Sequence, residues 1–218
     1  MNDVTAGPAP ARARWGMVAI HGRGATAASI ADLPQALGLT DVAVIAPQAE
    51  GFSWWPTSFL APAAQMEPHV ISGLARVDAA VEALQAAGLP RHRIAVLGFS
   101  QGGCLALEYA ARHGAGLGAV FGLSGGLVGT GDAGGASTQA LYGHAPKRFD
   151  YDADLSGLRV VLACHTADPH IPLQRVEETA EVMARLGATV TKHLEPGPGH
   201  NLTDAGVAAI RAVLNTTD

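Results

Sequence analysis

The sequence predicts an α/β fold, built on a minimal doubly wound, mostly parallel sheet of about six strands. Three observations predict it. Short β-rich runs alternate with longer helical ones. Several of the β-rich runs are continuously apolar, as in Ile94–Leu97, and the sequence contains no internal repeat. A strand with apolar side chains on both sides is covered on both faces, so these runs indicate a sheet between two layers of helices.

The strand candidates are short segments of apolar and β-branched residues between turn residues. Most are followed by a glycine, a polar residue or a proline, where the chain can turn toward a helix. In chain order they are Trp15–His21, Asp41–Ala46, Arg93–Phe99, Leu117–Leu123, Leu158–Ala163 and Thr189–Leu194.

The helix candidates lie between the strands and repeat their apolar residues at helical spacing. They are His69–Ala87, Gln101–His113, Leu173–Leu186 and Asp204–Leu214. Gly88 and Gly187 follow two of them at the position where a helix commonly ends with a left-handed residue. Strand and helix alternating in this way favours parallel pairing in one sheet.

The chain has 218 residues, of which 48% are hydrophobic and 15% charged. This length and composition predict one globular domain, which we place at residues 15–218. Residues 1–14 lack the apolar core of a signal peptide, and we expect them to form a flexible N-terminal leader.

Charge and cysteine content exclude several classes of protein. The net charge is −5 and no long basic run occurs, so a nucleic-acid partner is not expected. No apolar stretch approaches the length of about 18–20 residues that spans a bilayer. Cys104 and Cys164 lie in apolar segments, which predicts buried free thiols and a cytoplasmic location. A homodimer is compatible with this sequence, as is a monomer.

The segment from Gly125 to Gly157 is long, irregular and rich in glycine. A loop of this length in a compact domain is usually functional or mobile. We interpret it as a flap over the site, and a surface excursion without a role is the alternative.

Gly98-Phe99-Ser100-Gln101-Gly102 matches G-x-S-x-G, the strand-to-helix turn that exposes the nucleophile of α/β hydrolases. Gly122–Gly126 also fits the pattern, with Ser124 at its centre. Ser100 ends an apolar strand and opens a helix, whereas no helical pattern follows Ser124. The sequence therefore predicts Ser100 as the nucleophile, and a tight turn with an idle serine is the alternative reading for both.

In this fold the acid and the base follow the nucleophile along the chain. Asp168 lies just beyond the strand that ends at Ala163, and His200 lies on a loop rich in proline and glycine before the last helix. We expect Asp168 to orient His200 and His200 to contact Ser100. The rival acids Asp150, Asp152 and Asp154 follow no strand, and His21, His165 and His170 are interpreted as local hydrogen-bonding residues.

Acyl transfer needs N–H donors for the developing oxyanion. One candidate is the backbone N–H of Gln101, the residue after the nucleophile. The other is expected from the glycine-rich turn His21–Thr26, after the first strand. This turn has neither the lysine nor the spacing of a phosphate-binding loop.

Apolar side chains gather in the loop that follows the second strand. Such a loop can provide an apolar wall for substrate, or its side chains can simply cover the edge of the sheet. The candidate substrate-binding residues are Trp54, Trp55, Phe59, Leu60 and Ile171.

These motifs together resemble the phospholipase/carboxylesterase family of α/β hydrolases, which includes the acyl-protein thioesterases. The residues that carry the resemblance are His21-Gly22-Arg23-Gly24-Ala25-Thr26, Gly98-Phe99-Ser100-Gln101-Gly102-Gly103, Asp168-Pro169-His170-Ile171-Pro172-Leu173 and Gly199-His200. The resemblance extends from about Trp15 to Leu214. It implies an α/β-hydrolase fold without a large cap domain, and a serine esterase that needs no metal or organic cofactor. It also implies that the second oxyanion N–H belongs to Arg23, where relatives usually have an apolar residue.

The resemblance implies a small-molecule ester as substrate, and we favour esters of short to medium acyl chain. Acyl-protein thioesterase or lysophospholipase activity is the alternative within the family. From other classes, we weigh a metal-dependent hydrolase that uses Cys164, His165, Asp168, His170 and His200 as ligands. We also weigh a binding protein that has the hydrolase fold but no catalysis.

Overall fold

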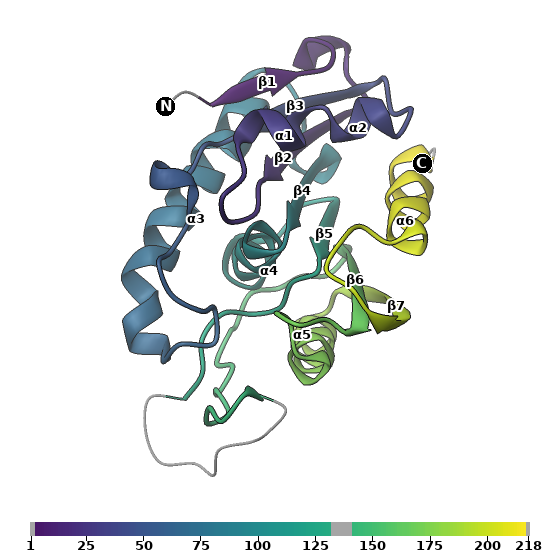
Figure 1. The fold of residues 1–218 in the computed structure, drawn as a ribbon. Helices are drawn as coiled ribbons and strands as arrows, with labels where there is room; N and C mark the ends of the chain where they lie inside the picture. The colour runs from purple at the N-terminus through teal and green to yellow at the C-terminus, as the bar shows by residue number, and fades with distance from the viewer. Residues whose placement is uncertain (1–2, 132–140, 217–218) are drawn as a thin grey trace.

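A computed structural model describes residues 3–131 and 141–216. Within them the chain forms a seven-stranded sheet in the order β1-β3-β2-β4-β5-β6-β7 (Figure 1). Strands β2 to β7 pair in parallel, and β1 pairs antiparallel with β3. The strands are β1 (Val4–Ala6), β2 (Trp15–Ile20), β3 (Val42–Ala46), β4 (Ile94–Phe99), β5 (Ala119–Leu123), β6 (Arg159–Ala167) and β7 (Thr189–Pro198).

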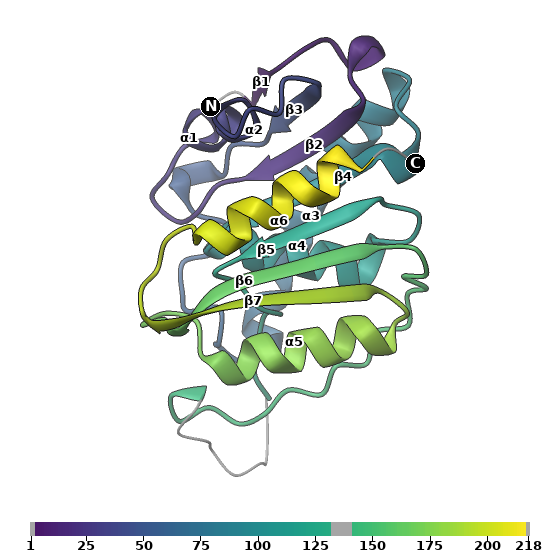
Figure 2. The same cartoon turned by 90° about the vertical axis from the view of Figure 1, so that its right-hand side faces the viewer.

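Helices cover both faces of the sheet, which is why its central strands are apolar on both sides. Figure 2 shows α6 lying across one face, with α3 and α4 behind the sheet. The buried apolar residues accordingly form two clusters, one on each face. The helices are α1 (Ala27–Ala31), α2 (Leu33–Ala36), α3 (Ala63–Ala86), α4 (Gln101–His113), α5 (Leu173–Arg185) and α6 (Asp204–Asn215). No described helix is long and apolar enough to cross a membrane.

The strand order reverses between β2 and β4. From β2 the chain moves outward to β3 and then returns to add β4 on the other side of β2. The carboxyl ends of two such strands leave a crevice, and ligands of open α/β sheets bind there. The turn after β2 and the turn after β4 are the two candidate site motifs of the sequence, so the topology brings them to one place.

The expected strands and long helices are present, and most of their bounds agree within a few residues. The short helices α1 and α2 were not expected, because four or five residues are too few to show a helical period. Strand β7 continues to Pro198, through a stretch that the sequence suggests is a loop. It is an edge strand paired only with β6, and proline is tolerated on such an edge.

The expectation of a flexible leader is wrong for residues 4–12. Val4–Ala6 forms β1, and Pro10–Arg12 forms a short 3-10 helix. Strand β1 pairs with Val44–Ala46 of β3, and an ion pair joins Asp3 to Arg76 of α3. A strand of three residues has too few positions to show alternation, which explains why the sequence does not reveal it.

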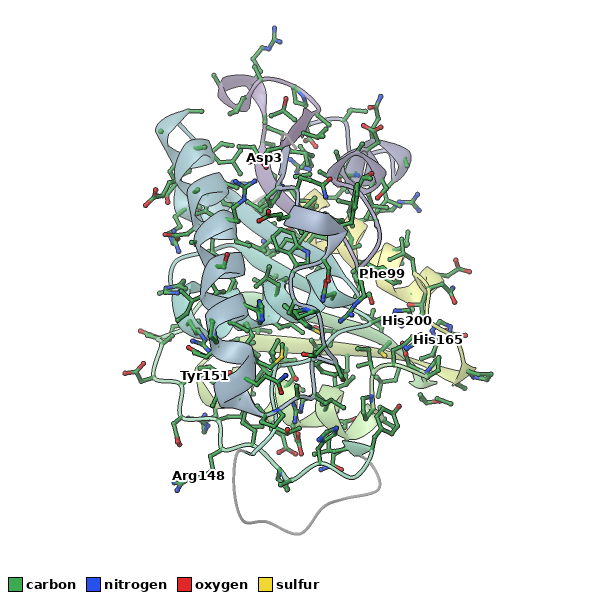
Figure 3. All side chains as sticks on the ribbon, turned by 60° about the vertical axis from the view of Figure 1, so that its left-hand side comes forward. Asp3, Phe99, Arg148, Tyr151, His165 and His200 are labelled. Atoms are coloured by element: carbon green, nitrogen blue, oxygen red, sulfur yellow. The ribbon has the colours of Figure 1, made fainter. Side chains whose placement is uncertain are left out.

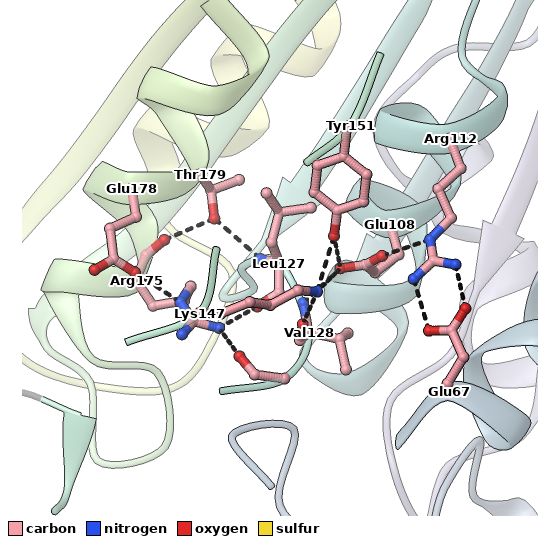
Figure 4. A network of polar contacts seen from close by, with 11 residues as sticks. Glu67, Glu108, Arg112, Leu127, Val128, Lys147, Tyr151, Arg175, Glu178 and Thr179 are labelled. Atoms are coloured by element: carbon pink, nitrogen blue, oxygen red, sulfur yellow. Dashed lines mark hydrogen bonds and ion pairs between the residues drawn. The ribbon is translucent and has the colours of Figure 1, made fainter. Parts of the chain in front are cut away.

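The segment from Gly125 to Gly157 was interpreted as a flap, and residues 132–140 of it lie outside the described residues. The described start of the segment belongs to the core, since residues 125–130 are buried. Fully buried Glu108 of α4 accepts hydrogen bonds from the Val128 N–H at 2.8 Å and the Tyr151 hydroxyl at 2.7 Å (Figure 4). Buried Arg175 of α5 donates to the carbonyl oxygens of Leu127 and Gly129 at 2.6 and 2.7 Å.

Candidate active site

Three side chains from three different loops meet at the carboxyl edge of the sheet. The Oγ of Ser100 lies 2.8 Å from Nε2 of His200, and Nδ1 of His200 lies 2.8 Å from Oδ2 of Asp168. Ser100 follows β4, Asp168 follows β6 and His200 follows β7. The structure thus brings together the residues predicted as nucleophile, base and acid, in the geometry that serine hydrolases use.

Ser100 lies on a strained turn between β4 and α4. Its backbone has φ 56° and ψ −121°, a conformation that L-residues rarely adopt. A Cβ on Gly98 would lie 2.0 Å from the carbonyl oxygen of Gly102, and one on Gly102 would lie 2.1 Å from that of Ile20. Both positions therefore require glycine, and this explains the spacing of the motif.

Asp168 is held as a carboxylate by several donors. Its Oδ1 accepts hydrogen bonds from the backbone N–H groups of His170 at 2.8 Å and Ile171 at 3.0 Å. Burial raises the pKa of Asp168, but the hydrogen bond from His200 and the two backbone donors outweigh it, so the pKa is lowered overall. An ionised Asp168 accepts from Nδ1 of His200, which leaves Nε2 free to accept the serine proton.

Aromatic rings surround His200 and restrict its position. The ring centroids of Phe99 and His170 lie 5.2 and 4.7 Å from that of His200, and Figure 3 shows His165 on the same side of the molecule. A Cβ on Gly199 would lie 2.5 Å from the His165 ring, so this ring packs under the loop that carries His200. His165 is therefore a packing residue, because its buried Nδ1 has no hydrogen-bond partner among the described residues.

The rival serine lies in a different environment. Ser124 also has a positive φ, 45°, but it is only 1% exposed. Its N–H donates to the carbonyl oxygen of Ala163 at 2.7 Å, which extends the parallel ladder between β5 and β6 by one bond. A substrate cannot reach a hydroxyl buried at this position without local opening.

His21 fixes the orientation of the peptide that joins Gly22 to Arg23. Its Nδ1 lies 2.7 Å from the Gly22 carbonyl oxygen and donates to it, while its Nε2 accepts from the Ala49 N–H at 3.1 Å. Burial lowers the pKa of His21, more than the bond to Gly22 raises it, so the ring is neutral as this pattern requires. In a trans peptide the C=O and N–H point in opposite directions, so the Arg23 N–H points away from His21.

The side chain of Gln101 connects the turn at Ser100 to the loop of residues 47–62 between β3 and α3, which contains Trp54 and Trp55 and is called the aromatic loop below. Its Oε1 accepts from the Trp54 N–H at 2.9 Å, and its Nε2 donates to the Trp55 carbonyl oxygen at 2.9 Å. Because Gln101 begins α4 directly after Ser100, these bonds hold the loop against the nucleophile. Only the backbone N–H of Gln101 was predicted to contribute to the site, because residue spacing in the sequence gives no signal for this side-chain contact.

A cavity of about 510 Å³ lies beside Ser100. Trp55, Phe59 and Ile171 line it, as expected. Trp54 and Leu60 do not, and this corrects their assignment as substrate-binding residues. Trp54 turns away to donate from Nε1 to the His21 carbonyl oxygen at 2.9 Å, and Leu60 is buried in the core. Three further residues line the cavity without having been predicted to do so from the sequence, which are Ser58, Cys104 and His170.

Three of the residues weighed as zinc ligands bond to one another. Asp168 and His200 bond to each other, and Cys164 donates weakly to Asp168 with a separation of 3.6 Å. Burial raises the pKa of both Cys104 and Cys164 to about 12, so they are neutral thiols, and both are free. Within residues 3–131 and 141–216, no group of three or more His, Cys, Asp or Glu side chains is arranged to hold a metal ion.

The fold and the arrangement at the carboxyl edge of the sheet define an α/β hydrolase. The chain belongs to the phospholipase/carboxylesterase family, whose model matches residues 9–218. It is therefore a hydrolase of the carboxylesterase type. A comparison with curated proteins returns no match.

Solved structures agree with this assignment. A phospholipase/carboxylesterase from Dyadobacter fermentans is 33% identical with a TM-score of 0.85, covering 98% of this chain and 96% of that one. A carboxylesterase from Mesorhizobium loti shares the fold at 21% identity and a TM-score of 0.67, covering 94% and 91% of the two chains. Arabidopsis thaliana SOBER1 shares it at 19% identity and a TM-score of 0.64, covering 93% and 98%.

Proposed function

We propose that this protein is a serine carboxylesterase that cleaves carboxylic esters of short to medium acyl chain through an acyl-enzyme intermediate. The observation that carries the proposal is the chain of two 2.8 Å hydrogen bonds from Ser100 through His200 to Asp168, beside an open cavity. Both Cys104 and Cys164 are free thiols, which supports a reducing compartment such as the cytoplasm.

In the acylation step, Ser100 Oγ attacks the ester carbonyl carbon and its proton passes to His200 Nε2. Asp168 stays ionised and stabilises the imidazolium that forms. His200 then protonates the leaving alcohol. Water attacks the acyl-enzyme with the same imidazole as base, and Ser100 is regenerated.

The negative charge of each tetrahedral intermediate needs donors that are already in place. The backbone N–H of Gln101 is one, at the N-terminus of α4, where the helix dipole also favours a negative charge. The Arg23 N–H is the other, and the bond from His21 to Gly22 fixes its direction. The bond from the Ala49 N–H to Nε2 keeps neutral His21 in the tautomer that has its proton on Nδ1, and this proton makes the bond to Gly22.

The cavity accommodates the apolar part of the substrate. Trp55, Phe59 and Ile171 supply an apolar wall, and the volume of about 510 Å³ lies in the range of small-molecule sites. The bonds from Gln101 hold Trp55 near the nucleophile, so the wall and the reacting serine keep a constant separation.

The test is a comparison of Ser100→Ala with the native enzyme on a series of nitrophenyl esters from acetate to palmitate. We expect Ser100→Ala to reduce kcat by several orders of magnitude without change in folding, because it removes the nucleophile. We expect kcat/KM of the native enzyme to be highest for short to medium chains. Full activity of Ser100→Ala would contradict the mechanism, and a maximum at palmitate would contradict the proposed chain length.

A further inference from the structure

The cavity beside Ser100 contains a charged side chain that the proposed catalytic cycle does not use. Arg23 takes part in that cycle only through its backbone, yet the residue lines the cavity together with Ser100 and His200. Its side chain is exposed. The guanidinium of an arginine is a cation with five N–H donors.

The guanidinium is fixed in place by the aromatic loop. Its Nη1 donates to the Pro56 carbonyl oxygen at 3.0 Å, and its Nη2 donates to that of Thr57. These carbonyls lie between Trp55 and Ser58, which both line the cavity. The bonds use two of the five N–H donors of an arginine, so others remain available to a ligand. Because the side chain is already ordered, binding a ligand costs little further conformational entropy.

The charge at this position is not neutralised by the cavity wall. Among the described residues, no aspartate or glutamate lines the cavity, and Arg23 forms no ion pair. The proposed catalytic carboxylate, Asp168, is only 4% exposed and bonds to the Nδ1 of His200, on the side of the ring that faces away from Ser100. The molecule as a whole has a net charge of −5. The mouth of the cavity is therefore a local cationic site on an acidic protein.

We propose that Arg23 selects esters that carry a carboxylate, with the scissile carbonyl at Ser100 and the carboxylate at the guanidinium. This inference rests on the proposed esterase function and names its substrate class. A guanidinium and a carboxylate form charge-assisted hydrogen bonds of matching planar geometry, roughly twice as strong as neutral ones. A neutral ester of the same size makes only the apolar contacts with Trp55, Phe59 and Ile171.

The experiment compares two matched pairs of substrates. Monomethyl adipate against methyl hexanoate places the carboxylate on the acyl side. A carboxy-substituted nitrophenyl butyrate against nitrophenyl butyrate places it on the alcohol side. For each pair the measured quantity is the ratio of kcat/KM for the charged ester to that for the neutral ester. The enzymes are the native protein, Arg23→Gln, Arg23→Lys and Arg148→Gln.

Arg148→Gln is the control for net charge, because Arg148 is exposed and projects far from His200 in Figure 3. We expect Arg23→Gln to lower the ratio about ten- to thirty-fold for at least one pair, as the loss of a charged hydrogen bond implies. Arg23→Lys should retain part of the ratio, because it keeps the charge but loses the planar geometry. Arg148→Gln should leave the ratio unchanged.

A ratio that stays the same in Arg23→Gln for both pairs would overturn the proposal, even if both esters react more slowly. An equal fall in Arg148→Gln would also overturn it, because net charge alone would then explain the effect. Failure of the proposed function has a different signature, in which the native enzyme hydrolyses none of the four esters.

Discussion

At the scale of single residues, Asp168 shows how a buried carboxylate is kept ionised. Two backbone N–H groups and the imidazole of His200 donate to it. They lower its pKa against the opposing effect of burial. The turn Asp168–Ile171 therefore serves the site through its backbone, and the same turn places the ring of His170 against His200.

Replacement of Asp168 by asparagine tests this role in catalysis. The asparagine oxygen should stay with the backbone donors of His170 and Ile171, which places its NH2 group opposite Nδ1 of His200. Because an NH2 group can only donate, the ring then carries its proton on Nε2, the wrong tautomer to accept from Ser100. We expect kcat to fall by about four orders of magnitude with little change in KM. Steady-state kinetics on a neutral nitrophenyl ester measures it, and a fall of less than ten-fold would exclude Asp168 as the acid.

The same variant tests the pKa of Asp168 through stability. Since the folded-state pKa lies below the unfolded value of about 3.9, ionisation stabilises the fold above that value. This contribution is lost as pH falls through the folded-state pKa. The free energy of unfolding of the native protein should therefore decline more steeply below about pH 4 than that of Asp168→Asn. Parallel declines in denaturant titrations at several pH values would contradict the lowered pKa.

At the scale of elements, a buried charge cluster joins α4, α5 and the chain that follows β5. Glu108 accepts from Val128 and Tyr151, and Arg112 pairs with it at 3.0 Å. Figure 4 shows these bonds together with those of Arg175. They fix residues 125–130 within the core, so this stretch cannot act as a flap without breaking hydrogen bonds to buried charged side chains.

Glu108→Gln should therefore destabilise the fold by about 3–5 kcal/mol at conserved volume, because it leaves the largely buried ammonium of Lys147, 3.6 Å from Glu108, without a counter-charge, whereas Arg112 keeps its pair with Glu67. Asp41→Asn is the matched control, since it breaks the partly exposed pair with Arg14 and should cost less than about 1 kcal/mol. Urea unfolding measures both changes. Equal losses would show that the cluster is no stronger than a surface pair.

Elements differ in how well the sequence predicts them. The parallel core strands and α4 follow from long apolar runs and a clear helical period, so their positions agree closely with the structure. Strand β1 and the helices α1 and α2 are too short to carry a period. The side chains of Ser100, Asp168 and His200, predicted from motif and chain order, lie together in the structure, whereas only part of the cavity lining was predicted. Trp54 and Trp55 are adjacent and chemically alike, and only the packing of the loop decides which one lines the cavity beside Ser100.

At the scale of the whole molecule, the reversal of strand order between β2 and β4 explains where the site lies. It brings the turn that contains Arg23 and the turn that contains Ser100 to one crevice, and β6 and β7 deliver Asp168 and His200 to the same edge. The chain has a net charge of −5, whereas the lining of the cavity includes Arg23 and no carboxylate among the described residues, so the positive charge at the mouth is local.

The most direct test of Ser100 as the nucleophile is to map the residue that a fluorophosphonate probe modifies. Such a probe phosphonylates a serine only when a base activates its hydroxyl and donors stabilise the oxyanion. Peptide mass spectrometry should place a single phosphonyl group on Ser100, and the modification should be absent in His200→Ala. Modification of Ser124 instead, or of Ser100 with equal speed in His200→Ala, would contradict the account.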